Sequence, residues 1–377
     1  MRHCHLSVQL KAQEMNTLIS NLINPLPLWF LILFSIGLLS LSKLLINFLK
    51  WVHATFFRPE RNLTDYGSWA LVTGATDGIG KAIAFELANK GLNLLLLGRN
   101  QGKLQDVTNS IRSKHNYIKI KIIVLDLAID MSVGINCLRS AIEGLDLGIV
   151  VNSAGVTYPG AMYFHEADEA VWDPVIRVNV EATAWVTWVV VRKMAARNKP
   201  GAVVNIGSAS SVVVPSFPLY AVYAASKAFV DMFSKCLNVE YTSMGIDVQC
   251  QIPLYVATKM ISATTTSTFV PSPEHYAKCA IHRIGYESRC TPYWSHAIQW
   301  CLCSFVPDFM LNHLRLLIGI RKRSDRLRAT IGDDHKNTIN MKKVDCNSRI
   351  QFRWIIQRIW PGLSLDYPVE ILFLKFD

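Results

Sequence analysis

The stretch that decides the fold is Thr73-Gly-Ala-Thr-Asp-Gly-Ile-Gly80, which joins two segments of different periodicity. The residues before it, WALVT at 69–73, form a short apolar run typical of a buried strand. The residues after it, KAIAFELANK at 81–90, have the pattern of a helix that Gly91 ends. A glycine turn in this setting lets a pyrophosphate approach the helix N-terminus, whose free N–H groups favour anions. The turn therefore predicts a dinucleotide site.

Strand-like runs recur along the chain, at residues 92–97, 120–125, 147–151 and 202–205. Segments of helical length separate them, and this alternation is typical of a parallel sheet with helices on both faces. We therefore predict an α/β fold, a Rossmann-type doubly wound sheet in a single domain. In such sheets the ligand lies at the carboxyl ends of the strands.

The second strand run is followed by Arg99. An enzyme that prefers NAD commonly presents an acidic side chain there to the ribose 2′-hydroxyl, whereas arginine suits a 2′-phosphate. Arg99 therefore favours NADP, and the alternative is a surface arginine without a role. Asp77, within the glycine turn, would repel the phosphate if its side chain pointed inward.

Tyr223 and Lys227 are four residues apart, which places them on the same face of a helix. An ammonium held there stabilises phenolate and lowers the tyrosine pKa, as a general acid for a carbonyl oxygen requires. Such a pair is common on solvated helices. Here it follows a glycine turn and a serine at a strand end, Ser208, so the combination predicts a carbonyl reductase or alcohol dehydrogenase site.

These segments together resemble the short-chain dehydrogenase/reductase family over about residues 67–320. The resemblance rests on TGATDGIG at 73–80, NSAG at 152–155, Asn179 in RVNVEAT, NIGS at 205–208 and YAASK at 223–227. Within the family the chain is most similar to the plant-type, membrane-bound very-long-chain 3-oxoacyl-CoA reductases. That likeness includes GLDLGIVVNSAG, YFHEAD and GIDVQCQIPLYVATKM at 245–260.

The resemblance implies NADPH-dependent reduction of a very-long-chain 3-oxoacyl-CoA to the 3-hydroxyacyl-CoA in fatty-acid elongation. Tyr223 would donate the proton, Lys227 would hold the ribose, Ser208 would bind the carbonyl and Asn179 would position a water. The resemblance also assigns the cofactor-binding residues: Gly74, Thr76, Gly78, Ile79, Gly80, Arg99, Asp126, Asn152, Val256 and Thr258, together with Tyr223 and Lys227.

Three positions depart from the family pattern. Ser153 replaces the second asparagine of the usual NNAG, and Leu254 stands where many relatives have glycine. Ser208 lies 15 residues before Tyr223, where 13 is commoner, so Ser210 is an alternative for its role. We favour Ser208 because it stands at the strand end. Tyr220 has the wrong offset from the lysine.

An apolar segment at 26–49 precedes the globular part, with Lys43 as its one charge. As a helix it would span about 36 Å, enough to cross a bilayer. We predict a transmembrane anchor between an N-terminal segment (1–25) and a linker (50–66); the alternative is a buried helix of a soluble protein. The basic residues after it place the rest of the chain in the cytosol, and the resemblance implies the endoplasmic reticulum. Met15 is an alternative start.

Residues 292–320 are also apolar, but Pro307, Asp308, His313 and Arg315 interrupt them. We predict a membrane-surface segment or a cover over the substrate rather than a second span. The basic run at 321–328 would meet lipid headgroups. It begins a predicted basic tail, 321–377, in which the part beyond about 335 resembles nothing we can place.

The chain has 377 residues, 51% of them hydrophobic, and a net charge of +11, which disfavours disordered and fibrous architectures. Residues 67–270 carry 17 basic and 15 acidic groups, so we expect no nucleic-acid partner. Nine cysteines without a pairing pattern suit reduced thiols, and Cys301 and Cys303 lack the further ligands of a metal site. We expect an acyl-CoA substrate, a membrane and other elongase components as partners. The alternatives are a membrane-bound steroid or other lipid ketone reductase, and a non-catalytic elongase scaffold.

Overall fold

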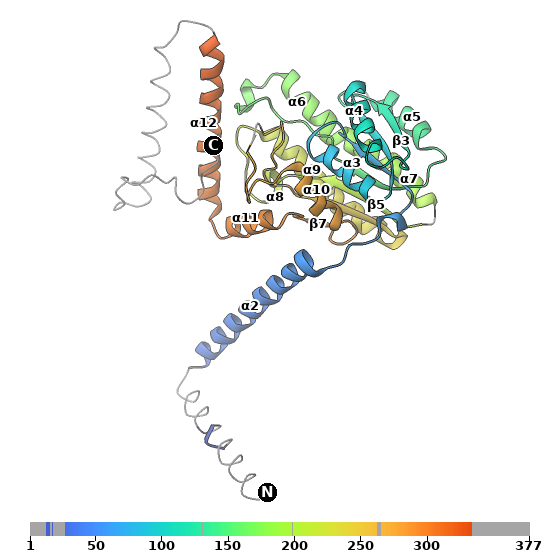
Figure 1. Cartoon of the computed structure of the whole chain (residues 1–377). Coiled ribbons are helices and arrows are strands. Elements are labelled where there is room, and N and C mark those ends of the chain that lie inside the picture. Colours follow the sequence, from blue (N-terminus) through green and yellow to red (C-terminus); the bar gives the residue numbers. More distant parts are fainter. Residues whose placement is uncertain are drawn as a thin grey trace, which may run out of the picture.

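The protein is built on a seven-stranded, wholly parallel sheet with helices on both faces (Figure 1). The structure is a computed structural model that describes residues 13–15, 17, 27–129, 131–197, 199–261 and 265–333. The strand order is β3-β2-β1-β4-β5-β6-β7, which confirms the predicted doubly wound fold. The order reverses between β1 and β4, and this switch point is where such sheets bind their ligands.

The strands are β1 Trp69–Thr73, β2 Asn93–Gly98, β3 Ile120–Val124, β4 Leu147–Asn152, β5 Gly201–Ile206, β6 Ile246–Gln251 and β7 Arg289–Cys290. The helices within the domain are α3 Gly78–Asn89, α4 Gln101–Arg112, α5 Met131–Ile142, α6 Glu169–Ile176, α7 Thr183–Ala196, α8 Ala209–Val212, α9 Ala221–Tyr241 and α10 Pro273–His282. Three further helices are α2 Leu28–Val52, α11 Trp294–Ser304 and α12 Asp308–Asp333.

The core consists of two apolar layers, one on each face of the sheet. The central strands β1, β4 and β5 are buried at every residue because helices cover both faces. Side chains of α3, α4 and α10 fill one layer, and side chains of α5 and α7 fill the other. The two layers fix the strand ends, and so they fix the loops that carry the candidate site.

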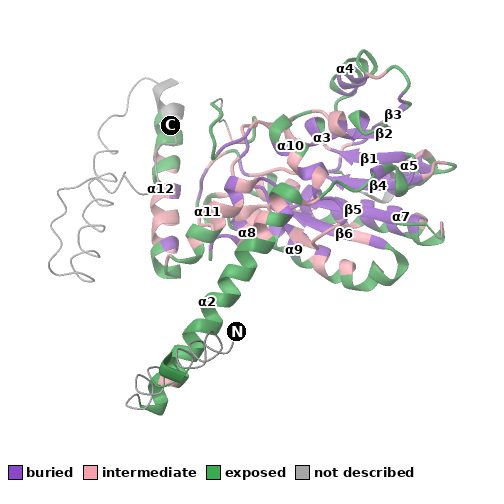
Figure 2. Cartoon of the chain, turned by 60° about the horizontal axis from the view of Figure 1, so that its bottom comes forward, coloured by how far each residue is buried: buried purple, intermediate pink, exposed green. Residues whose placement is uncertain are grey.

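The predicted anchor forms a single helix, α2, which a short π-helical turn continues to Phe57. No residue of α2 is buried, and the helix extends away from the sheet domain (Figure 2). This contradicts the alternative of a buried soluble helix. From Leu28 to Phe57 the segment is long and apolar enough to cross a membrane.

The apolar segment before the C-terminus forms two helices, α11 and α12, and the chain bends by 118° between them. The break at residues 305–307 includes the predicted helix breaker Pro307. α12 continues past the predicted domain end at residue 320 to Asp333, so the basic run at 321–328 is helical rather than part of a tail. An ion pair between Arg323 and Glu166, described below, joins this run to the domain. The rest of the predicted tail, from residue 334, lies outside the described residues.

Candidate active site

The glycine turn brings the carboxyl end of β1 against the loop after β4. Gly74 has a φ of +66°, and a side chain there would lie 2.8 Å from the Cα of Ala154. A side chain at Gly80 would lie 2.4 Å from the carbonyl oxygen of Gly74. Only glycine fits at these two positions. The turn therefore exposes backbone at the N-terminus of α3, where a pyrophosphate fits.

Asp77 does not present a free charge to the turn. Its Oδ1 accepts a hydrogen bond from the Gly78 N–H at 2.9 Å, and its Oδ2 lies 2.8 Å from the Lys259 ammonium. The hydrogen bond from Lys259 is the main reason why the pKa of Asp77 is below its usual value. The predicted repulsion of a phosphate is therefore offset, because Asp77 caps α3 and is paired with a lysine.

Three lysines that the sequence analysis missed gather beside the turn. Lys81, Lys103 and Lys259 line a cavity of about 170 Å³ together with Thr76 and the carboxylates of Asp77 and Asp106. Arg99, at the end of β2, is exposed and does not line this cavity. No sequence pattern connects these lysines, because they lie in three separate elements: α3, α4 and the loop after β6.

The predicted cofactor residues at two further strand ends also make contacts within the protein. Asp126, just after β3, accepts a hydrogen bond from the Ala128 N–H at 3.0 Å. Asn152, at the end of β4, is buried, and its Nδ2 donates to Asn205 Oδ1 at 2.8 Å and to Thr187 Oγ1 at 2.9 Å. Both N–H groups of this amide are thus used between β4, β5 and α7 rather than directed outward.

Ser208 and Tyr223 come together at the carboxyl end of β5. Ser208 caps α8, and Tyr223 lies in the first turn of α9. Ser208 lies close enough to Tyr223 to lower the pKa of its phenol, against the larger effect of burial. The alternative serine, Ser210, is buried behind, with its Oγ 2.9 Å from Ser208 Oγ. The extra two residues of spacing therefore leave Ser208, not Ser210, beside the tyrosine. Tyr220, at the start of α9, packs on Tyr158 instead.

Lys227 is buried one turn further along α9, and its Nζ donates to the Ile206 carbonyl oxygen at 2.9 Å. Burial lowers the pKa of Lys227 to about 8. Burial also raises the pKa of Tyr223 above its usual value, and the nearby Ser208 offsets this in part. The predicted lowering of the tyrosine pKa by Lys227 is therefore not found, because desolvation by burial dominates.

Asn179 lies in a π-helical turn, Arg177–Ala182, between α6 and α7. Such turns in a helix often mark functional sites. The side chain is fully buried and exchanges hydrogen bonds with the backbone of Val156, at 2.9 and 3.0 Å, and donates to Ser226 Oγ at 3.0 Å. A side chain at Gly155 would lie 3.4 Å from both Asn179 Oδ1 and Lys227 Nζ. Asn179 therefore joins the loop after β4 to α9 beside the lysine.

The segment 252–261 follows β6 and lies against the glycine turn. Val256 is buried, and Thr258 Cγ2 would lie 3.2 Å from a side chain at Gly78. A buried residue that the sequence analysis missed, His296 of α11, holds this segment. Its Nδ1 accepts from the Leu254 N–H at 3.3 Å, so Nε2 carries the proton toward the Tyr255 carbonyl oxygen at 3.1 Å. Burial lowers the pKa of His296 to about 4.

Helix α12 lies along the same end of the domain (Figure 1). Arg323 forms an ion pair with Glu166, with Nε 2.8 Å from Oε2. Ser216 Oγ lies 2.5 Å from Asn312 Oδ1, and Arg315 Nη1 lies 3.3 Å from the Tyr255 hydroxyl. The helix thus bridges three loops around the tyrosine, and this position suits the predicted substrate cover.

A half-buried serine and tyrosine beside a buried lysine, next to a glycine turn, suit a site for reduction of a carbonyl or oxidation of an alcohol. The family model for short chain dehydrogenases matches residues 68–268. The chain belongs to this family. The predicted resemblance is thus confirmed, and with it the oxidoreductase class. Within the described residues, no group of three or more His, Cys, Asp or Glu side chains is placed to hold a metal ion.

Several proteins similar to this short-chain dehydrogenase have names that state an activity or its absence. It is 50% identical to a very-long-chain 3-oxoacyl-CoA reductase-like protein of Arabidopsis thaliana, over 77% of this chain and 93% of that protein. It is 42% identical to the human inactive hydroxysteroid dehydrogenase-like protein 1, over 66% and 75%. It is 38% identical to the very-long-chain 3-oxoacyl-CoA reductase of Rattus norvegicus, over 68% and 80%.

Solved structures share the fold. A 7beta-hydroxysteroid dehydrogenase is 25% identical with a TM-score of 0.57, over 64% of this chain and 93% of that one. A protein described as an NAD(P)-dependent gluconate 5-dehydrogenase, from Beutenbergia cavernae with bound NADP, is 26% identical with a TM-score of 0.53, over 60% and 94%. Both likenesses agree with the parallel sheet and its switch point.

Proposed function

We propose that this short-chain dehydrogenase reduces a very-long-chain 3-oxoacyl-CoA to the 3-hydroxyacyl-CoA with NADPH, in fatty-acid elongation. The observation that carries the proposal is the placement of Ser208 and Tyr223 beside the buried Lys227 at the carboxyl end of β5. A non-catalytic chain has no need to keep a desolvated lysine next to a tyrosine. The identity to reductases of this class, 50% and 38%, supports the substrate.

The chain's own residues fit NADPH. The glycines at 74 and 80 let the turn pack closely on backbone, and this places the N-terminus of α3 at the end of β1, where a pyrophosphate would bind. Lys103 and Lys259 supply positive charge beside Asp77, and Arg99 stands exposed at the end of β2 for the 2′-phosphate. Val256 and Thr258 would border the nicotinamide. The cofactor, when bound, supplies the hydride for the carbonyl carbon.

The proton for the carbonyl oxygen comes from Tyr223. Because burial raises its pKa, the phenol is protonated at neutral pH and can donate. Ser208 Oγ holds the same oxygen, and its bond to Ser210 keeps it oriented. Lys227, with a pKa of about 8, gains stability as a cation when negative charge develops on the phenol oxygen. Asn179 keeps the loop and helix that meet at Lys227 in register.

The long apolar acyl chain explains why this domain would be attached to a membrane. We assign residues 26–49 to an anchor in the endoplasmic-reticulum membrane, the domain that follows to the cytosol, and α11 and α12 to a substrate cover. The exposed apolar surface of α2 supports the anchor. Other elongase components would then be neighbours in the same membrane.

The test is NADPH oxidation by membranes that contain the full chain, with a long-chain 3-oxoacyl-CoA as substrate. We expect Tyr223→Phe to lower kcat by a factor of about a thousand, because it removes the general acid, while NADPH binding persists. Tyr220→Phe, which alters the neighbouring tyrosine at the start of the same helix, is the matched control and keeps kcat within a few-fold. Equal rates for Tyr223→Phe and the unchanged chain would refute the assignment.

One relative favours a second candidate, since the human protein at 42% identity is named inactive. A non-catalytic scaffold would bind elongase components equally well with Tyr223→Phe and would oxidise no NADPH. The 7beta-hydroxysteroid dehydrogenase fold likeness gives a third outcome. Turnover of a steroid ketone without turnover of any 3-oxoacyl-CoA would replace the acyl substrate with a steroid or other lipid ketone.

A further inference from the structure

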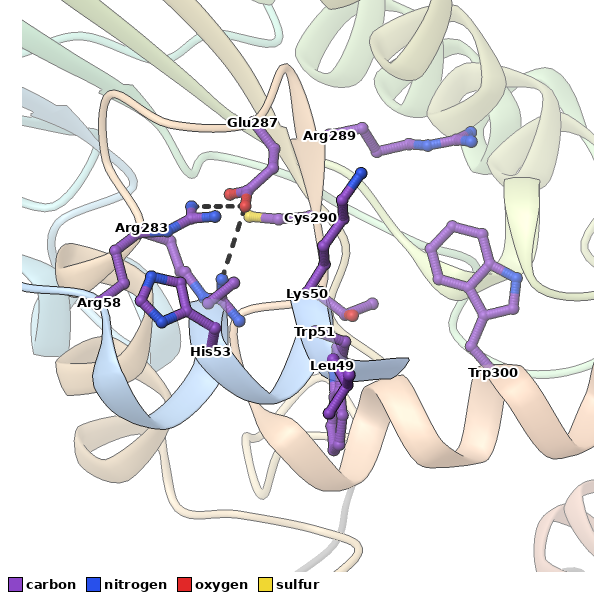
Figure 3. A pocket seen from close by; sticks show the side chains of 12 residues that line it. Leu49, Lys50, Trp51, His53, Arg58, Arg283, Glu287, Arg289, Cys290 and Trp300 are labelled. Atoms are coloured by element: carbon purple, nitrogen blue, oxygen red, sulfur yellow. Dashed lines mark hydrogen bonds and ion pairs between the residues drawn. The ribbon is translucent and has the colours of Figure 1, made fainter. Parts of the chain in front are cut away.

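A cavity of about 680 Å³ lies where α2 meets the sheet domain, away from the residues of the candidate active site (Figure 3). Its walls come from the last turn of α2, the residues just after it, the segment 283–291 that contains β7, and α11. In Figure 1 this junction is at the base of the domain, where the long helix α2 ends. A ligand there would contact both the anchor and the domain.

The lining is strongly cationic. The lining contains four basic side chains and one carboxylate, that of Glu287. The basic side chains are Lys50, Arg58, Arg283 and Arg289. Glu287 Oε1 lies 2.5 Å from Arg58 Nη1 and 3.7 Å from Arg283 Nη1, so two guanidiniums share this carboxylate. The cluster therefore holds more positive charge than its own acidic residue neutralises.

The two remaining cations, Arg289 and Lys50, line the cavity from different elements, β7 and α2. Arg289 lies 3.3 Å from Asp231 Oδ2, but Asp231 also pairs with Lys235 at 2.5 Å. Lys50 makes no hydrogen bond or ion pair with any residue that the structure describes. In Figure 3 the Lys50 side chain rises from α2 between Cys290 and Trp300, in the direction of Arg289. An anion between them would gain two charge-assisted contacts.

The remaining wall is apolar and lies toward the anchor. Leu49, Trp51 and Trp300 form this side, and the Arg289 guanidinium lies 5.3 Å from the centre of the Trp300 ring. A small soluble anion would gain nothing from this wall. A ligand with a phosphate at one end and an acyl chain at the other matches both walls.

The position of Lys50 along α2 also favours a lipid ligand. Lys50 lies in the last turn of the helix that we assign to the membrane, which is the level of the lipid headgroups. Anionic lipids of the cytosolic leaflet attract basic groups at this level. We propose that the cavity binds an anionic phospholipid, with its phosphate between Lys50 and Arg289 and its acyl chain along Trp51 and Trp300. This inference rests on the membrane anchor of the proposed function.

The experiment places the full chain in lipid nanodiscs of phosphatidylcholine that contain a minority of phosphatidylinositol. Native mass spectrometry then measures the ratio of the two lipids that stay bound. We expect enrichment of phosphatidylinositol by the unchanged chain, and a loss of about fivefold for Lys50→Gln, since one basic group near the surface is worth about 1 kcal/mol. Lys50→Glu should abolish the enrichment.

Lys119→Glu is the matched control, because Lys119 is an exposed lysine beside the edge strand β3 and its reversal changes the net charge equally. It should keep the enrichment. Thermal melting by circular dichroism confirms that each variant is folded. An unchanged lipid ratio in both Lys50 variants would overturn the proposal.

A separate arm uses nanodiscs of phosphatidylcholine alone with added glycerol phosphate. If glycerol phosphate raises the melting temperature of the unchanged chain but not of Lys50→Glu, the site takes a soluble phosphate and the lipid assignment is wrong. Failure of the chain to enter nanodiscs at all would refute the anchor instead, which distinguishes the two proposals. Reductase activity plays no part in either readout.

Discussion

The two sides of the candidate cleft are built by different forces. On the catalytic side, Lys227 is 6% exposed, and Asn179 is fully buried among hydrogen bonds. On the closing side, the Lys259 side chain is 81% exposed, and its contact with Asp77 is an ion pair at the surface. Buried polar groups are costly to leave unpaired, whereas exposed ion pairs contribute little. The catalytic side is therefore held by buried hydrogen bonds, whereas the Lys259 contact on the closing side is exposed to water.

The largest expected effect separates the two serines, Ser208 and Ser210. Ser208→Ala removes the side chain next to Tyr223, and we expect kcat to fall by a factor of about a hundred. Ser210→Ala leaves Ser208 in place and should cost less than tenfold. Steady-state rates of NADPH oxidation for the two variants measure this. A larger loss for Ser210→Ala would mean that the longer spacing has exchanged their roles.

A pH titration examines the contact between His296 and the segment 252–261. His296 is buried with its pKa lowered to about 4, against about 6.5 in the unfolded chain. The folded state thus binds fewer protons between these values, so stability is complete above pH 6.5 and falls toward pH 4. The full shift corresponds to about 3 kcal/mol of unfolding free energy.

Denaturant unfolding at several pH values measures this loss, with His296→Gln as the comparison. The variant should be less stable at neutral pH but should show a shallower decline between pH 6.5 and 4. Parallel declines in the two proteins would assign the acid sensitivity to other groups. Hydrogen exchange of residues 252–261 should rise first as the pH falls.

The exposed pair between Lys259 and Asp77 should affect cofactor binding rather than stability. Lys259→Met leaves Asp77 uncompensated beside the glycine turn, and we expect the Kd for NADPH to rise about fivefold, a difference of about 1 kcal/mol. The double variant with Asp77→Asn should recover part of the loss. NADPH fluorescence titrations of the four proteins form the cycle that tests this coupling. Additive effects would show that the pair does not act as a unit.

The smallest effect is expected at the ion pair between α12 and the domain. Glu166→Gln removes the partner of Arg323, at the surface, and should raise KM for a long acyl substrate less than threefold with kcat unchanged. Kinetics with a short and a long 3-oxoacyl-CoA measure this. A fall in kcat for both substrates would move α12 from the cover to the chemical site.

Much of the fold could be predicted because its signals are local. The turn at 73–80, the apolar strand runs and the helix spacing each depend on neighbours in the chain. Strands β1 to β5 agree with the predicted runs, whereas no predicted run corresponds to β6 or β7. The end of α12 could not be predicted, since the basic run after residue 320 is held by Arg323 and Glu166, which are 157 residues apart. Composition alone made that run resemble a tail.

For the site, the sequence by itself singled out the candidate side chains, because helix spacing places Tyr223 and Lys227 on one face and a strand end places Ser208. Only the tertiary structure decided how they are used. It placed Ser210 behind Ser208, kept the pKa of Tyr223 high through burial, and paired Asp77 with Lys259. It also brought His296 under the closing segment. These outcomes depend on desolvation and on contacts between distant residues, which no local pattern records.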